Sequence, residues 1–213
     1  MSTITAAMFS FPLGEDAALL PRTPAIAEAY QELLVANFDR LLRWLPGMGQ
    51  LPSLEQTTAD LALRGQAWLD GSQLPLAIAV RADSGLSAGG DLPAGGGWRL
   101  VGEVNLLIDA HIRAAEVGYW LDVDFEGRGL ATRAVAAALD WAFGPLGLRR
   151  IKLFAIDGNE RSIGVAQRLG FTREGVFRAA AVVSGVEHDV VGYGLLAREF
   201  TGGRSTGRAP IPR

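Results

Sequence analysis

A glycine-containing segment in the middle of the chain has the residue types of an anion-binding turn. It reads Glu126-Gly127-Arg128-Gly129-Leu130-Ala131-Thr132 and stands between an expected strand and a strongly apolar helix. The start of a helix presents unpaired amides and the positive end of the helix dipole, which together attract phosphate. Glycine allows close approach of the backbone, and Arg128 and Arg133 add positive charge. The spacing matches neither a Walker A loop nor the Rossmann fingerprint, so alone it indicates a phosphate near a helix start or a simple tight turn.

Two further parts of the chain offer side chains suited to proton transfer. Glu116 and Glu103 lie in neighbouring expected strands, and each carboxylate is a candidate general base. A solvent-facing position would explain either residue equally well. Asn159 and Ser162 begin a short expected helix. Asn159 is a good helix cap, but capping alone does not call for a serine three residues later.

The elements that must position these residues follow from the period of the apolar side chains. Helical spacing predicts helices over residues 24–45, 53–70, 130–143 and 159–169. The first should end at Pro46-Gly47, and Ser53 should open the second with a capping box, placing Leu54, Leu61 and Trp68 on its inner face. Alternation and short apolar runs predict strands over residues 6–13, 74–80, 99–109, 116–122, 151–156, 179–183 and 190–196. This order predicts one mixed α/β layer rather than repeated βαβ units.

Composition limits the class of protein. The 213 residues fit one domain over 1–200, a flexible Gly/Ser/Pro-rich surface loop at 84–97 and a disordered tail at 201–213. A net charge of -3 argues against a nucleic-acid partner. The chain has no cysteine and only two histidines, which exclude disulfides and disfavour a metal site. No signal peptide or membrane-spanning stretch is visible, so we expect a cytoplasmic protein without a membrane partner.

Several short segments in the second half of the chain follow one another in a characteristic order. They are EVGYWL at 116–121, GRGLAT at 127–132, NERS at 159–162, RLGF at 168–171, EGVFR at 174–178 and HDV at 188–190. Together they resemble the GNAT acetyltransferases, in particular the RimJ/RimL-like branch. Linked motifs in order are more specific than any one of them. The resemblance implies a single α/β (α+β) domain with a mixed, mostly antiparallel central sheet and helices on both faces. It also implies acetyl-CoA as donor and a primary amine as acceptor.

The resemblance also implies roles for particular residues on the donor side. The backbone of Trp120, Leu121 and Val123 would receive the pantetheine arm of acetyl-CoA on a strand that splays from its neighbour. Its diphosphate would bind the turn formed by Gly127, Arg128, Gly129, Leu130, Ala131 and Thr132. The family has Gln or Arg where this chain has Glu126, which we expect to point outward.

For the chemical step, the resemblance implies one group that protonates the leaving thiolate and one that deprotonates the amine. Asn159 would contact the pantetheine arm, and the Ser162 hydroxyl would protonate the leaving thiolate. Many other GNAT members use a tyrosine on this helix, and none is present here. Glu116 matches the position of a catalytic glutamate in some relatives, with Glu103 as its rival.

The acceptor is open at this stage. The first hypothesis is an α-amine at the N-terminus of a protein or peptide. The second is a small amine such as an antibiotic, polyamine or amino acid, and the third is a non-catalytic acyl-CoA-binding module. We expect the segment 24–70 and the last hairpin to line the acceptor pocket, with Trp44, Trp68 and Trp120 as candidate aromatics. The fold is compatible with a homodimer.

Overall fold

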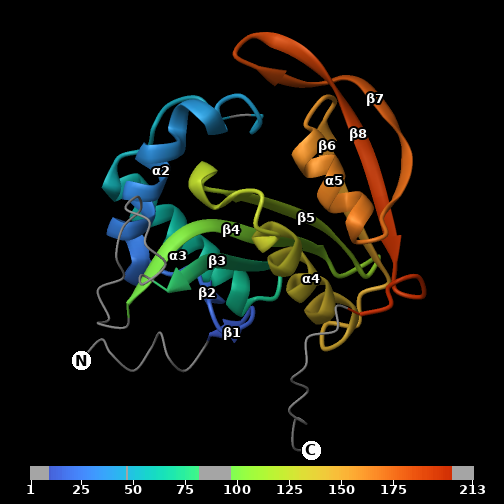
Figure 1. Cartoon of the computed structure of the whole chain (residues 1–213), viewed down its shortest axis with the longest axis horizontal. Helices are drawn as coiled ribbons and strands as arrows, with labels where there is room; N and C mark the ends of the chain where they lie inside the picture. Colours follow the sequence, from blue (N-terminus) through green and yellow to red (C-terminus); the bar gives the residue numbers. More distant parts are fainter. Residues whose placement is uncertain (1–9, 47, 82–96, 203–213) are drawn as a thin grey trace, which may run out of the picture.

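The central element of the molecule is a twisted sheet (Figure 1). The computed structural model describes residues 10–46, 48–81 and 97–202, and within them eight strands pair in the order β1-β2-β3-β4-β5-β6-β8-β7. Every neighbouring pair is antiparallel except β5 and β6, which are parallel. The mixed, mostly antiparallel sheet is therefore confirmed. The strands are β1 (Phe11–Pro12), β2 (Ala17–Pro21), β3 (Gln73–Arg81), β4 (Trp98–Asp109), β5 (Ala114–Leu121), β6 (Arg150–Ile156), β7 (Thr172–Val183) and β8 (Val186–Leu196).

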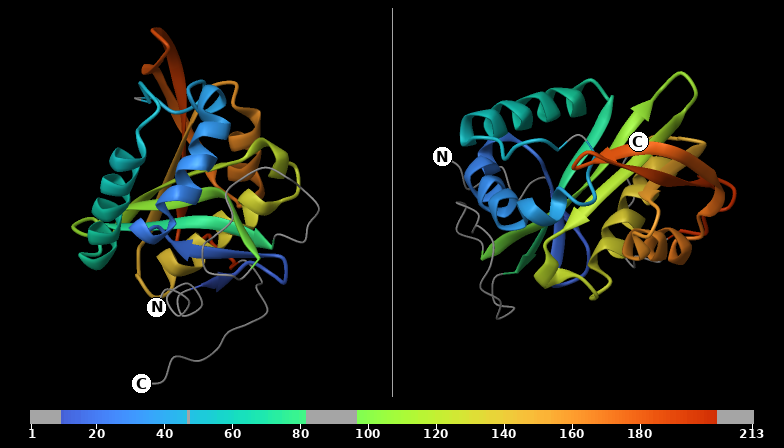
Figure 2. Two further views of the ribbon diagram at one scale, coloured as in Figure 1. Left: turned by 90° about the vertical axis from the view of Figure 1, so that its left-hand side faces the viewer. Right: turned by 90° about the horizontal axis from the view of Figure 1, so that it is seen from above.

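Helices cover both faces of the sheet, as expected. They are α2 (Ala27–Leu41), α3 (Leu54–Leu69), α4 (Leu130–Phe143) and α5 (Glu160–Arg168), with short 3-10 helices η1 (Pro24–Ile26) and η3 (Val123–Phe125). The side view places α2 and α3 on one side of the sheet and α4 on the other (Figure 2). Successive residues of β3 confirm the two layers, since Ile78 packs with the α4 and α5 cluster and Ala77 with the α2 cluster.

The capping box predicted at Ser53 is present. The Ser53 hydroxyl accepts from the amide of Gln56 at 3.2 Å, and the Gln56 side chain accepts from the Ser53 amide at 2.8 Å. Leu61 lies on the inner face of α3 and is fully buried. Leu54 is 43% exposed, so its predicted inward position is wrong. Leu54 is the first residue of α3, and the first residue of a helix can extend past the sheet that the rest of the helix covers.

Two strands differ from the sequence prediction. The buried strand β2 was missed because its five residues, AALLP, form too short an apolar run to show a period. The strand β7 begins at Thr172, well before the predicted Ala179, and most of its side chains are exposed because it is an edge strand. The register of its pairing with β8 shifts between Arg173 and Gly175 and again between Phe177 and Ala181, where Ala179 has a φ of 51°. The Ala179 amide donates to the Asp189 carboxylate at 2.9 Å, which holds the second irregularity in place.

Some expectations fall on residues that the structure does not describe. The described residues contain the end of the loop predicted at 84–97 and the start of the tail predicted at 201–213, while 82–96 and 203–213 lie outside them, as do residues 1–9 and Gly47. Among the described helices, none combines the length and the apolar character needed to cross a membrane.

Candidate active site

The strands β5 and β6 separate in the middle of the sheet. Their parallel pairing ends with Glu116 opposite Lys152. Beyond this point β5 continues to pair with β4 as far as Leu121, while β6 continues to pair with β8 as far as Ile156. Beyond this point, β5 and β6 no longer form backbone hydrogen bonds with each other. The N–H and C=O groups along their facing edges are therefore available to a ligand.

A cleft of about 1310 Å³ lies at this separation. Its walls come from the end of α2, the strands β5 and β6, the turn before α4, the start of α5 and the β7–β8 hairpin. Side chains along β5 alternate, so Val117 and Tyr119 lie on the α4 and α5 face while Glu116 and Trp120 lie on the opposite face. Because residues of both sets line the cleft, it is accessible from both faces of the sheet.

The glycine turn lies at the α4 side of the cleft. Gly127 and Gly129 have φ values of 75° and 73°, the left-handed conformation that glycine adopts without strain. A Cβ at either position would meet no atom within 4 Å, so the space in front of the turn is open. Gly129 is the N-cap of α4, whose first amides have no intrahelical acceptor. The turn thus has the geometry of an anion site at a helix start.

Most residues expected at the donor side line the cleft. Those that do are Trp120, Leu121, Gly127, Gly129, Leu130, Ala131, Thr132, Asn159 and Ser162. Val123 and Arg128 are outside the lining, and the Arg128 guanidinium lies 5.5 Å from the centre of the Phe125 ring. Arg133 donates to the backbone carbonyl of Leu13 at 2.6 Å and pairs with Asp16 at 2.8 Å, so its charge is used in anchoring the β1–β2 turn.

Glu126 points into the protein rather than outward, which corrects the sequence prediction. Its side chain is 16% exposed and accepts from Arg40 of α2 at 2.8 Å. Its other oxygen pairs with Arg161 of α5. Arg40 also donates to the backbone carbonyl of Leu121. The carboxylate is inward because two arginines neutralise it, and Arg40 lies 86 residues away in sequence, where no local pattern reveals it.

The two candidate bases differ in their partners. The Glu103 carboxylate accepts from the guanidinium of Arg22 and the hydroxyl of Tyr30, both of which are buried. Burial, and then the neighbouring Glu103 carboxylate, raise the pKa of Tyr30 well above its ordinary value, so Tyr30 remains a donor. Glu103 does not line the cleft. Its interactions make it a structural residue under α2.

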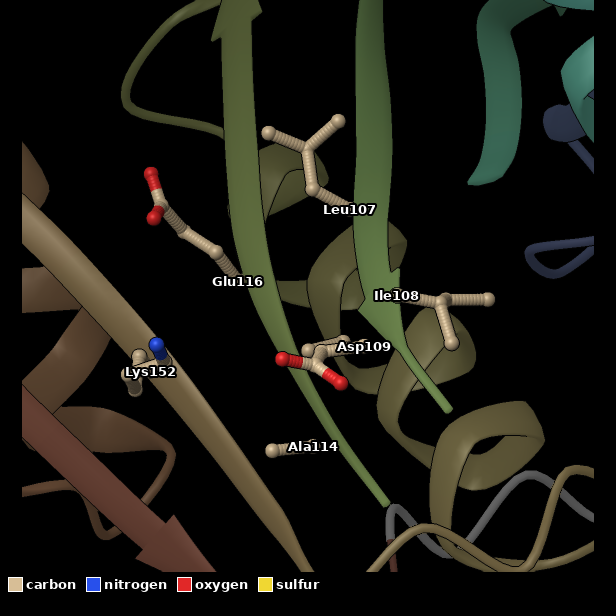
Figure 3. Close-up of a pocket in the computed structure, with 7 residues that line it drawn as sticks. Leu107, Ile108, Asp109, Ala114, Glu116 and Lys152 are labelled. Atoms are coloured by element: carbon tan, nitrogen blue, oxygen red, sulfur yellow. The ribbon is translucent and has the colours of Figure 1, made fainter. Parts of the chain in front are cut away.

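Glu116 is the carboxylate that remains available. Glu116 lines the cleft, and its side-chain carboxylate makes no hydrogen bond or ion pair within the described parts of the chain. It also borders a smaller depression of about 230 Å³, together with Leu107, Asp109 and Lys152 (Figure 3). An unpaired carboxylate open to solvent and to the cleft can accept a proton from a bound molecule and pass it to water.

Ser162 has a partner that the sequence did not suggest. Its Oγ lies 3.0 Å from the hydroxyl of Tyr119, and its amide donates to the Asn159 side chain at 3.2 Å. Burial raises the pKa of Tyr119. This tyrosine comes from β5, 43 residues earlier, and not from the helix. Only the packing of α5 against β5 brings the two hydroxyls together.

Apolar side chains form the side of the cleft opposite the glycine turn. They belong to Trp44, Phe154, Phe177 and Val190, and the rings of Phe154 and Phe177 meet edge to face with centroids 5.7 Å apart. Trp120 also lines the cleft, whereas Trp68 packs against the larger core cluster and does not line the cleft. Of the segment 24–70, only the end of α2 and the residues after it reach the cleft, and α3 does not.

No group of three or more His, Asp or Glu residues in the described ranges is arranged to hold a metal ion. The described cleft contains the glycine turn at a helix start, the carboxylates of Glu116 and Glu160, and the Tyr119–Ser162 hydroxyl pair.

Comparison with known proteins gives a consistent result. The model of the acetyltransferase (GNAT) domain matches residues 19–172. The protein named "Putative ribosomal N-acetyltransferase YdaF" from Bacillus subtilis (strain 168) is 34% identical over 200 residues, covering 92% of this chain and 99% of its own. Spermidine N(1)-acetyltransferase from Escherichia coli (strain K12) is 37% identical over 75 residues, covering 35% of this chain and 40% of its own.

Among solved structures, the fold is similar to that of RimL, a ribosomal L7/L12 alpha-N-protein acetyltransferase, in complex with coenzyme A. The TM-score is 0.76 at 22% sequence identity, covering 88% of this chain and 98% of that chain. At this identity the likeness concerns the fold alone.

Proposed function

The chain belongs to the GNAT family of acetyltransferases and transfers acetyl groups to amines, and from this premise we propose that acetyl-CoA is its donor and a protein or peptide N-terminal α-amine its acceptor. One observation supports this most directly. The cleft at the β5–β6 separation has an anion-binding turn on one face of the sheet and an unpaired carboxylate, Glu116, on the other. Two substrates can thus approach a common point from opposite sides.

The donor would occupy the α4 and α5 side of the cleft. The turn with Gly127 and Gly129 offers backbone amides and a helix dipole to the diphosphate. The edge of β5 freed beyond Glu116 offers sheet-like hydrogen bonds to the amide groups of the pantetheine arm, along the backbone of Trp120, Leu121 and Val123. Asn159 and Ser162 lie beside this path.

The acceptor would reach the same point from the α2 side. An α-amine has a pKa of about 7.7–8.0, so near neutral pH most of it is an ammonium that must lose one proton before attack. Glu116 lies on this face and has no competing partner among the described residues, so it can take that proton directly or through water. Much of the acceleration comes from holding both reactants in alignment. An unpaired Glu116 also argues against a module that has lost its base.

The wall around the acceptor favours a peptide over a polyamine. Trp44, Phe154 and Phe177 give it apolar surface, while Glu126 is neutralised by arginines. Glu160 also lines the cleft, but it lies at the start of α5, on the side proposed for the donor. A polycation would need several free carboxylates at the acceptor wall, whereas one α-ammonium needs one. The relative with full coverage is named for ribosomal N-acetylation, and the spermidine enzyme aligns over 35% of this chain. A small monoamine with an apolar body is the second candidate.

The test is a direct assay of acceptors. Purified protein is mixed with acetyl-CoA and short peptides that differ at the first residue, an N-terminally blocked copy of each, spermidine and amino acid amides, and free thiol is measured. We expect thiol release with free peptides and none with blocked copies, with mass spectrometry placing the acetyl group on the α-amine. Release with spermidine alone would favour the small-amine function. Tight CoA binding without any release would favour the non-catalytic module.

A further inference from the structure

We propose that Tyr119 is a positioning residue that directs the Ser162 hydroxyl proton towards the sulfur of the departing thiol. The inference rests on the proposed acetyl transfer and concerns its second half, the expulsion of the thiolate. Tyr119 lies in β5, the strand that forms one edge of the cleft, and Ser162 lies in the first turn of α5.

The position of the serine is determined by its backbone. The Ser162 amide donates to the Asn159 cap, which places the residue in the first turn of α5. Its hydroxyl oxygen then lies 3.0 Å from the Tyr119 hydroxyl, and its carbonyl oxygen lies 3.3 Å from the same hydroxyl. Both side chains line the cleft, so a ligand can reach the pair.

A count of protons shows what the tyrosine does. Each hydroxyl has one proton to donate. When Tyr119 donates to Ser162 Oγ, the serine proton is free to point into the cleft. When the serine instead donates to Tyr119, it has no proton left for a ligand. Burial raises the pKa of Tyr119, so its hydroxyl stays protonated. Its one proton can go to Ser162 Oγ at 3.0 Å or to the Ser162 carbonyl at 3.3 Å, and the shorter contact is the arrangement that we propose.

The chemical step balances with this arrangement. As the tetrahedral adduct collapses, the bond between the acyl carbon and sulfur breaks and its electron pair goes to sulfur. The Ser162 Oγ proton follows to sulfur, giving the free thiol. The hydrogen bond from Tyr119 stabilises the negative charge that develops on the serine oxygen. The oxyanion of the adduct re-forms the carbonyl as the carbon–sulfur bond breaks, and the extra proton on nitrogen passes to solvent. Solvent returns one proton to the serine, so the amine and the thioester give the amide and the free thiol.

The pair has no other evident purpose in the structure. The carbonyl of Ser162 does not need the tyrosine, because it lies in the first turn of α5, where the amide four residues later is its helical donor. A tyrosine that served only as packing on this face would not need its hydroxyl, and neighbouring positions of β5 on the same face hold Val117 and Leu121.

The experiment is a double-mutant cycle on acetyl transfer, using Tyr119→Phe, Ser162→Ala and the pair together. We expect Tyr119→Phe to lower kcat about tenfold, the effect of one lost hydrogen bond, with the acceptor KM and the Kd for CoA nearly unchanged. We expect the double variant to be no slower than Ser162→Ala alone, because the tyrosine acts through the serine. Tyr193→Phe is the matched control, since this buried tyrosine of β8 does not line the cleft.

Three results would overturn the inference. They are an unchanged kcat in Tyr119→Phe, independent losses that multiply in the double variant, and a fall in CoA affinity equal to the fall in kcat, which would indicate a purely structural role. Absence of turnover in the unaltered protein would instead refute the proposed function, so the two failures are distinguishable.

Discussion

The two sides of the cleft are built in different ways. The turn side consists of Glu126, Gly127, Gly129, Leu130, Ala131 and Thr132, which are nearly continuous in sequence. The hairpin side consists of Trp44, Leu45, Phe154, Phe177 and Val190, which come from the segment after α2 and from β6, β7 and β8. The turn side offers backbone amides, and the hairpin side offers side chains. The turn side, proposed for the donor, is therefore a local motif, while the hairpin side, proposed for the acceptor, is assembled by the fold.

The two sides also differ in charge. On the turn side, the carboxylate of Glu126 is balanced by Arg40 and Arg161. On the hairpin side, the wall is apolar, and Glu116 is the carboxylate at its border. In the proposed function, the anionic donor and the cationic acceptor would therefore meet surfaces of different character. Substitutions on one side should change one substrate and leave the other nearly unaffected.

The largest expected effect is loss of donor binding in Gly129→Trp. A side chain at this position enters the open space before α4, where the diphosphate would lie, so we expect the Kd for CoA to rise at least about a hundredfold. Calorimetry with CoA measures the change. Gly71→Trp is the matched control, because Gly71 has a similar φ of 77° and equally open surroundings but lies after α3, away from the cleft. Full CoA affinity in a folded Gly129→Trp protein would disprove the turn assignment.

The next effect separates the two carboxylates. We expect Glu116→Gln to lower kcat about a hundredfold with little change in stability, since a general base contributes that much and this one has no partner to lose. We expect the pH–rate profile to lose the limb that reports the base. Glu103→Gln should instead reduce the free energy of unfolding by about 3 kcal/mol, because the buried Arg22 loses its nearest carboxylate and keeps only the more exposed Asp60 at 3.7 Å. Equal kcat values for the two variants would contradict this division.

A smaller effect is expected from the hairpin side. Phe177→Ala should raise the acceptor KM about tenfold by removing part of the apolar wall, while the Kd for CoA stays the same. The side chain is 53% exposed, so the fold should tolerate the change. Val182→Ala serves as the control, as Val182 is similarly exposed on the same strand and outside the cleft. A loss of CoA affinity in Phe177→Ala would show that the two sides are not independent.

The smallest effect concerns the charge on the turn side. We expect Glu126→Gln to tighten CoA binding about threefold, because it removes a negative charge near the diphosphate and releases two arginines from their shared partner. Arg40 should keep its place through the Leu121 carbonyl. The gain should shrink as salt is added. Weaker binding in the variant would mean that the carboxylate serves mainly to hold the arginines in position.

The elements with strong local signals were predictable. Helix α4 has the predicted bounds because its apolar residues repeat at helical spacing, and α3 starts at the predicted Ser53 cap. Gly170 follows α5 with a φ of 79°, the left-handed conformation in which a glycine commonly ends a helix. The strand β7 was predicted only in part, because an exposed edge strand has no buried face to impose alternation.

By itself, the sequence determined the helices, most of the strands, the glycine turn and the family, because each depends on residues that are neighbours along the chain or on motifs in order. Tertiary structure alone decided which carboxylate is free, since Arg22 and Tyr30 pair with Glu103 across 73 or more residues. It also turned Glu126 inward and brought Tyr119 to Ser162. The physical reason is that hydrogen bonds and ion pairs depend on distances of a few ångströms, which only the packed fold determines.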